Sequence, residues 1–319
     1  MGDHGLLVWG GFTALVLGLL AVDLLVVNRR SHVLGVKEAG MWSAGLATIA
    51  TLFGGFLWWR EGSQKALEFY SGYLIELSLS VDNLFVFLLI FQYFAVPEKL
   101  QPRVLKWGIF GAMLMRGIMI ALGALLLQKF HWIVYVFGGI LVITGIRMLK
   151  PGGIEPVQPD KNPVVRIARK FLPFTAKYSQ DHFFTRMHGR TFGTPLLLVV
   201  LVVEWSDLVF AIDSIPAIFA VTRDPFIVYS SNVFAILGLR ALYFVLAGVM
   251  DRFHYLKPAV AAILVFVGLK MGLSAWIHVA TGVSLAVILG LLGAGVTASL
   301  LKPASPADPT KTPKGDPAH

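Results

Sequence analysis

Long runs of apolar residues alternate with short polar stretches along most of the chain. A helix needs about 20 mainly apolar residues to cross a hydrocarbon layer roughly 30 Å thick, and the pattern predicts about nine such spans. Their approximate centres are Leu17, Thr51, Asp82, Arg116, Val142, Asp207, Ile236, Leu264 and Leu289. The sequence therefore predicts an all-α polytopic membrane protein.

The third to fifth predicted spans resemble the sixth to eighth. "ELSLSVDN" at Glu76 matches "DLVFAIDS" at Asp207, and "LMRGIMIALG" with Arg116 matches "GLRALYFVLAG" with Arg240. Because a unit of three helices crosses the membrane an odd number of times, two tandem copies must enter from opposite sides. We expect an inverted repeat, with units at about 66–150 and 195–276, as in many secondary transporters.

Composition and charge agree with a membrane protein. Apolar residues make up 56% of the chain and charged residues only 14%, and the mean hydropathy is +0.74. Most Lys and Arg residues fall in alternate loops, which predicts an outside N-terminus and a cytoplasmic C-terminus in the inner (plasma) membrane. The net charge of +9 is then an orientation signal, so no nucleic-acid partner is expected. The chain has no cysteine, which excludes disulfides and thiolate metal sites.

One transmembrane domain is expected over residues 1–301. The first span lacks a basic N-terminal region, so we expect it to be retained and not cleaved as a signal peptide. A cytoplasmic loop at about 150–192 is too short and polar for a second domain. The tail at 302–319 is rich in Pro, Lys and Asp, which predicts disorder.

Carboxylates lie inside these apolar spans. They are Asp23, Glu76, Asp82, Glu204, Asp207 and Asp213. Each ionised carboxylate near the bilayer centre costs about 2.5 to 3.5 kcal/mol on insertion scales. Only Arg116 and Arg240 lie near mid-span to neutralise them. The others must be protonated, hydrated in a cavity or gathered around a cation; acids that only pair with arginines between helices are the alternative.

Helical spacing arranges the polar side chains in two stripes. The stripes contain Glu76, Ser80 and Asn83 in the first unit, and Glu204, Asp207 and Ser214 in the second. Asp82 and Asp213 point about 120° away on a regular helix, so they join the same site only if the helix is distorted. Pro216 offers such a distortion, because it lacks an N–H and clashes with the preceding turn.

The ligand atoms at these positions are all oxygens. Carboxylates, serine hydroxyls and the amides of Asn83 and Asn232 suit Mg, Ca or Mn, whereas Zn and Cu prefer thiolate or imidazole. None of the eight histidines lies mid-span near the acids. The chain has no P-loop, nucleophile elbow or zincin motif, so neither an enzyme nor a prosthetic group is expected.

Three segments carry a family resemblance: "YLIELSLSVDNLFVF", "VEWSDLVFAIDSIPAIFAVTRDPFIV" and "SSNVFAILGLRALYF". In them the chain resembles the TerC family of integral membrane proteins, in particular its Alx-like branch. The family is associated by name with tellurite resistance, and with export of manganese and related divalent cations. The resemblance implies a metal route through Glu76, Asp82, Asn83, Glu204, Asp207 and Asp213. It implies supporting roles for Asp23, Asn232, Arg116 and Arg240, to which the stripes add Ser80 and Ser214.

We therefore expect a secondary transporter that exports Mn²⁺, or another hard divalent cation, by alternating access. Protons are the candidate counter-ion, because an emptied cluster of like charges takes up protons readily. One alternative is a non-transporting membrane partner in a metal or tellurite stress-resistance complex. A passive channel is another.

Overall fold

The computed structural model describes residues 5–22, 35–130, 132–149, 162–187, 190–249, 255–274, 276 and 279–301. Every predicted span centre lies in a helix. These helices are α1 (Leu6–Val22), α2 (Val36–Glu61), α3 (Ser63–Tyr93), α4 (Gln101–Lys129), α5 (Ile133–Leu149), α7 (Pro195–Phe219), α8 (Pro225–Val249), α9 (Leu256–Gly272) and α10 (Thr281–Leu301). A short 3-10 helix, η2 (Glu98–Leu100), precedes α4.

Several of these helices have the length and composition of membrane spans. Within the described residues, α2, α7, α10, the joined η2 and α4, and α8 up to Val245 meet both conditions. Helices α1, α5 and α9 are apolar but shorter. Helix α3 has 31 residues, enough to cross a membrane, and it carries polar side chains such as Glu76 and Asn83 that are buried inside the bundle. The helical membrane class is thus confirmed, and the count of nine spans stays a prediction.

Glycine and proline set several helix boundaries. Gly62 separates α2 from α3 with φ +92°, in the left-handed region that favours glycine, and its N–H donates to the Trp58 carbonyl at 3.0 Å. Helices α4 and α7 have Pro102 and Pro195 in their first turns, where a missing N–H costs nothing. Pro216 lies inside α7, close to its end at Phe219. The helix distortion expected at Pro216 stays a prediction.

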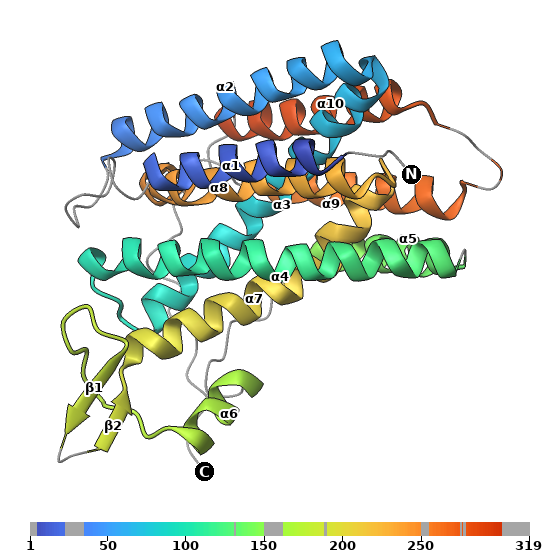
Figure 1. Cartoon of the computed structure of the whole chain (residues 1–319). Helices are drawn as coiled ribbons and strands as arrows, with labels where there is room; N and C mark the ends of the chain where they lie inside the picture. Colours follow the sequence, from blue (N-terminus) through green and yellow to red (C-terminus); the bar gives the residue numbers. More distant parts are fainter. Residues whose placement is uncertain are drawn as a thin grey trace.

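Most helices run side by side, and α3 crosses them obliquely (Figure 1). Helix α8 is almost entirely buried and packs against α2, α3 and α4. Three further pairs are important for the site: α3 packs on α7, α4 on α7, and α5 on α9. Large apolar side chains such as Trp59, Leu114 and Ile143 are exposed on the outside of the bundle, as lipid contact requires.

The segment expected to be a polar loop contains secondary structure at one end of the bundle (Figure 1). It includes α6 (Pro163–Phe171) and an antiparallel hairpin of β1 (Phe184–Met187) and β2 (Arg190–Gly193). The hairpin departs from the predicted all-α class. Its strands have only four residues each, too few for alternation to reveal them. We call this the hairpin end and the opposite one, at Gly62 and Lys129, the far end.

Hydrogen bonds attach the hairpin segment to the bundle. The Tyr178 hydroxyl donates to the Phe94 carbonyl at 2.8 Å, and the Thr194 hydroxyl donates to the His182 carbonyl at 2.7 Å. Burial raises the pKa of Tyr178 to about 12, so the phenol keeps its proton at neutral pH. These contacts fix the start of α7, the helix that carries Asp207.

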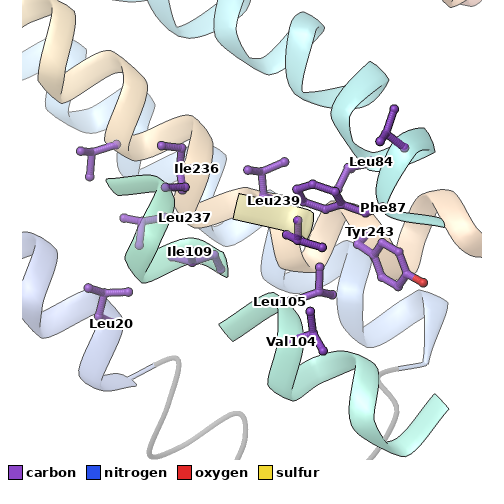
Figure 2. Packing of buried hydrophobic residues seen from close by; sticks show 14 of the residues in the cluster. Leu20, Leu84, Phe87, Val104, Leu105, Ile109, Ile236, Leu237, Leu239 and Tyr243 are labelled. Atoms are coloured by element: carbon purple, nitrogen blue, oxygen red, sulfur yellow. The ribbon is translucent and has the colours of Figure 1, made fainter. Parts of the chain in front are cut away.

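Buried apolar side chains fill the bundle in two clusters. Figure 2 shows Leu84 and Phe87 of α3, Leu105 and Ile109 of α4, and Leu239 of α8 within one cluster. A second apolar cluster joins α5, α9 and the far-end halves of α4 and α7.

The contact between α5 and α9 predicts a sharp difference between two adjacent glycines. A Cβ atom at Gly138 would lie 2.9 Å from the Gly268 carbonyl oxygen, whereas a Cβ at Gly139 meets nothing within 4 Å. We expect Gly138→Ala to destabilise the protein by about 1 to 3 kcal/mol, because backbone cannot yield as a side chain does. Thermal unfolding in detergent measures this, with Gly139→Ala as the control. Equal unfolding midpoints for the two variants would contradict the close packing.

Candidate functional site

The guanidinium of Arg116 on α4 is fully buried and bridges two helices. Its Nη2 donates to Asp207 Oδ1 at 2.9 Å and its Nε to Asp207 Oδ2 at 3.2 Å, a two-pronged contact with α7. Its Nη1 donates to Glu76 Oε1 on α3. Two-pronged arginine–carboxylate pairs are among the stronger and more directional polar contacts in proteins. Arg116 therefore fixes α3 and α7 relative to each other.

Neutral polar groups complete the arrangement. Asn232 of α8 donates from Nδ2 to Glu76 Oε2 at 3.0 Å, and Arg116 Nη1 also donates to the Ser214 hydroxyl at 3.4 Å. Ser80 donates to Glu76 Oε1 at 3.5 Å. We call this set the Arg116 cluster: Glu76, Ser80, Arg116, Asp207, Ser214 and Asn232. It joins α3, α4, α7 and α8.

Acidic and basic groups are unequal in number within the Arg116 cluster. Two carboxylates meet one guanidinium, so the fully ionised cluster carries one excess negative charge. Burying an unbalanced charge costs several kcal/mol, and a proton, a cation or another positive group must compensate it. The side chain of Arg240 is also buried, and it lines a small cavity of about 10 Å³ together with Asp207. That volume is close to the minimum needed for one water molecule.

The structure separates the predicted metal residues into groups. Glu76 and Asp207 meet at Arg116, with Ser80, Ser214 and Asn232 beside them, as the stripes predicted. Asn83 is buried, and its Nδ2 has no hydrogen-bond partner within the described residues. The side chain of Asp82 and all of Asp23 lie outside what the structure describes, as does the tail at 302–319.

Glu204 and Asp213 lie apart from Arg116. Glu204 lies against α4 where Gly111 leaves room, and its two buried oxygens have no hydrogen-bond partner among the described residues. Asp213 accepts a hydrogen bond from Thr144 of α5 at 2.9 Å. Its separation from Asp207 agrees with the angle expected on a regular helix. Over the described part of the chain, no group of three or more His, Asp or Glu side chains could hold a metal ion.

A second polar network closes the far end, and the sequence analysis missed it. Lys65 Nζ lies 3.1 Å from Glu68 Oε2 and 3.0 Å from Asp224 Oδ2, and the Thr222 hydroxyl donates to Glu68 at 2.6 Å. Asp224 also accepts from the Phe226 N–H at 3.0 Å, at the start of α8. The Asp-Pro pair before α8 and the spacing of Lys65 and Glu68 could have signalled it.

Beside this network is a pocket of about 240 Å³, lined among others by Glu68, Thr222, Lys270 and Ser274. We call it the far-end pocket. Apolar residues of α7, including Ile215 and Phe219, belong to the buried cluster between it and the Arg116 cluster. Buried apolar side chains of α7 therefore separate the far-end pocket from the Arg116 cluster.

Comparison with known proteins places the chain in a family. The profile of the integral membrane protein TerC family matches residues 61–306. A membrane protein of Myxococcus xanthus is 50% identical over 315 residues, covering 98% of each chain. Proteins of Shigella flexneri and Escherichia coli K12, each named "Putative membrane-bound redox modulator Alx", are 49% identical over 295 residues, covering 90% of this chain and 92% of theirs. No solved structure matches. The chain therefore belongs to the TerC family of integral membrane proteins.

Proposed function

We propose that the protein is a secondary transporter that exports a divalent cation, with Mn²⁺ as the first candidate substrate. The observation that carries this proposal is the meeting of Glu76 and Asp207 on one buried guanidinium. These two residues occupy equivalent positions in the two predicted repeat units. A pair of carboxylates at a repeat interface is where secondary transporters hold cations.

Helix packing supports the inverted repeat. If α3, α4 and α5 correspond to α7, α8 and α9, a two-fold axis exchanges the α3–α8 pair with the α4–α7 pair, and both pairs are in contact. The glycines agree. Gly138 meets Gly268, and Gly145 meets Ala261. The segment "GILVITGIRML" with Arg147 matches "AILVFVGLKMG" with Lys270 at an offset of 123 residues, so 138 corresponds to 261 and 145 to 268. The axis therefore exchanges these two contacts as well.

A hard divalent cation fits the chemistry of the Arg116 cluster. The guanidinium balances one of two carboxylates, whereas a divalent cation balances both, and all the available ligand atoms are oxygens. In the described arrangement the guanidinium of Arg116 lies between the two carboxylates. Protons on Glu76 or Asp207 would allow return without cargo, which gives cation/proton antiport. In the predicted orientation, the hairpin end faces the cytoplasm of the inner membrane and cargo leaves at the far end.

A non-transporting role in a metal or tellurite stress complex remains the second candidate. The α6 and hairpin segment favours it, because Phe171 and Phe184 are exposed there on an ordered surface. The names of the Alx relatives include a redox role. Such a role in this chain would not use thiol chemistry of its own, because the chain has no cysteine.

Metal flux through the purified protein separates these functions. Liposomes that contain the protein and a metal-sensitive dye should take up Mn²⁺ faster than protein-free liposomes. An opposing proton gradient should change the rate if protons are the counter-ion. Protein that is folded in the membrane and carries no Mn²⁺ under any imposed gradient would favour the non-transporting role.

A further inference from the structure

We infer that Arg116 and Arg240 alternate as the counter-ion of the Glu76–Asp207 pair, each filling the site in one of two conformations. Arg116 fills it in the described conformation, and Arg240 fills it in the other. This inference rests on the proposed transport function and its inverted repeat. It identifies the Arg116 and Arg240 guanidinium groups as the positive charges that neutralise the carboxylates when no cargo is bound.

Arg116 and Arg240 occupy equivalent positions in the two predicted repeat units. In an inverted repeat, the second conformation arises when each unit adopts the shape of the other. Glu76 then takes the place of Asp207, and Arg116 that of Arg240. The exchange swaps Glu76 and Asp207, so the carboxylate pair is the same before and after it. The bridging guanidinium is different, because Arg116 is replaced by Arg240. A two-fold related conformation must therefore present Arg240 to the same two carboxylates.

Arg240 lies near the carboxylate pair in the described conformation. Arg240 is almost fully buried on α8, the helix that also supplies Asn232 to Glu76. It lines the small cavity that Asp207 lines from α7, so it already lies beside one of the two carboxylates. The other lining residues are apolar or small, among them Gly108 and Ala112 of α4. The larger ones, such as Phe87 and Leu239, must shift for the Arg240 guanidinium to approach Asp207, and Arg240 must also give up the interaction that it makes in the described conformation.

Each arginine also has a neutral side chain within reach as a further hydrogen-bond partner. Arg116 donates to Ser214 in addition to the carboxylates. The residue equivalent to Ser214 in the first unit is Asn83, in the match of "ELSLSVDN" to "DLVFAIDS". Asn83 is buried, and its amide oxygen is an acceptor of the type that a guanidinium binds. It supplies the acceptor that Arg240 needs in the second conformation.

The spaces on the two sides of the carboxylate pair differ in size. The far-end pocket measures about 240 Å³, whereas the cavity next to Asp207 measures about 10 Å³ and is lined by Phe87, Leu105 and Leu239 among others (Figure 2). A separate pocket of about 510 Å³ lies at the hairpin end, lined by Phe94 and Leu198 among others. If the two units exchange shapes, the cavity next to Asp207 should widen when Arg240 holds the carboxylates, and the far-end pocket should shrink.

Cysteine labelling tests the exchange cleanly, because the chain has no cysteine of its own. One reporter is Ala112→Cys, which lines the small cavity and is 4% exposed. The other is Ser274→Cys in the far-end pocket. Arg116→Gln should favour the Arg240-bridged conformation and speed maleimide labelling at Ala112→Cys by about 10-fold, while labelling at Ser274→Cys slows. Arg240→Gln should leave Ala112→Cys protected and Ser274→Cys reactive.

Opposite shifts of the two reporters in Arg116→Gln, with neither reporter changed in Arg240→Gln, would support the exchange. Faster labelling of both reporters in both variants would mean simple loosening and would overturn it, as would labelling that neither variant changes. Arg116→Lys keeps the charge but loses the fork, so it should give a smaller shift in the same direction if Arg116→Gln does not fold. Labelling needs no cargo. Opposite shifts without Mn²⁺ flux would overturn the transport function alone, and flux without opposite shifts would overturn the exchange alone.

Discussion

Replacing Arg116 with Met should lower the stability of the protein by about 3 to 5 kcal/mol, the largest loss expected from any single substitution in this fold. In the described conformation the change leaves the carboxylates of Glu76 and Asp207 buried near each other without their shared donor, and a transfer of the pair to Arg240 would bring the loss toward the lower figure. Met fills a similar volume, so the loss measures charge and hydrogen bonding more than packing. Thermal unfolding in detergent and the yield of monodisperse protein measure the effect.

Arg103→Met provides the matched control. Arg103 pairs with Asp181, but both side chains are substantially exposed, and such pairs contribute only about 0 to 1 kcal/mol. A rescue variant makes the cause specific: Arg116→Met combined with Glu76→Gln and Asp207→Asn should regain most of the lost stability, since no buried charge remains. A single Arg116→Met variant as stable as Arg103→Met would contradict the role given to Arg116.

The second large effect is on transport. Asp207→Asn should reduce Mn²⁺ flux by about 30-fold or more, the equivalent of losing about 2 kcal/mol of charge interaction. Asn keeps an oxygen that accepts from Arg116, so the variant should fold. Equal amounts of folded protein in liposomes with a metal-sensitive dye give the comparison. Glu98→Gln, at an exposed site in η2, is the control. Equal flux in the two variants would remove Asp207 from the metal route.

Hydrophobic runs predicted where the helices lie, because each span must satisfy its own backbone hydrogen bonds in lipid. The helical period also predicted which polar residues share a face, and Glu76, Ser80, Asp207 and Ser214 do lie together at Arg116. Both results depend on local geometry alone. Local geometry is the part of a structure that a single sequence specifies most directly.

Contacts between distant segments could not be obtained in this way. The sequence placed Arg116 near mid-span, but no local pattern states that one guanidinium bridges two helices whose acids are 131 residues apart, at 76 and 207. The position of Glu204 against Gly111 and the bond from Thr144 to Asp213 also depend on helix packing. The α6 and hairpin segment was missed because its elements are short and polar.

The most direct test of the proposed site is a structure determined with Mn²⁺ present at millimolar concentration. The proposal predicts metal density between Glu76 and Asp207, at coordination distance from oxygens of both, with the Arg116 guanidinium moved away. Mn²⁺ bound elsewhere, with the contacts of Arg116 to both carboxylates unchanged, would contradict it.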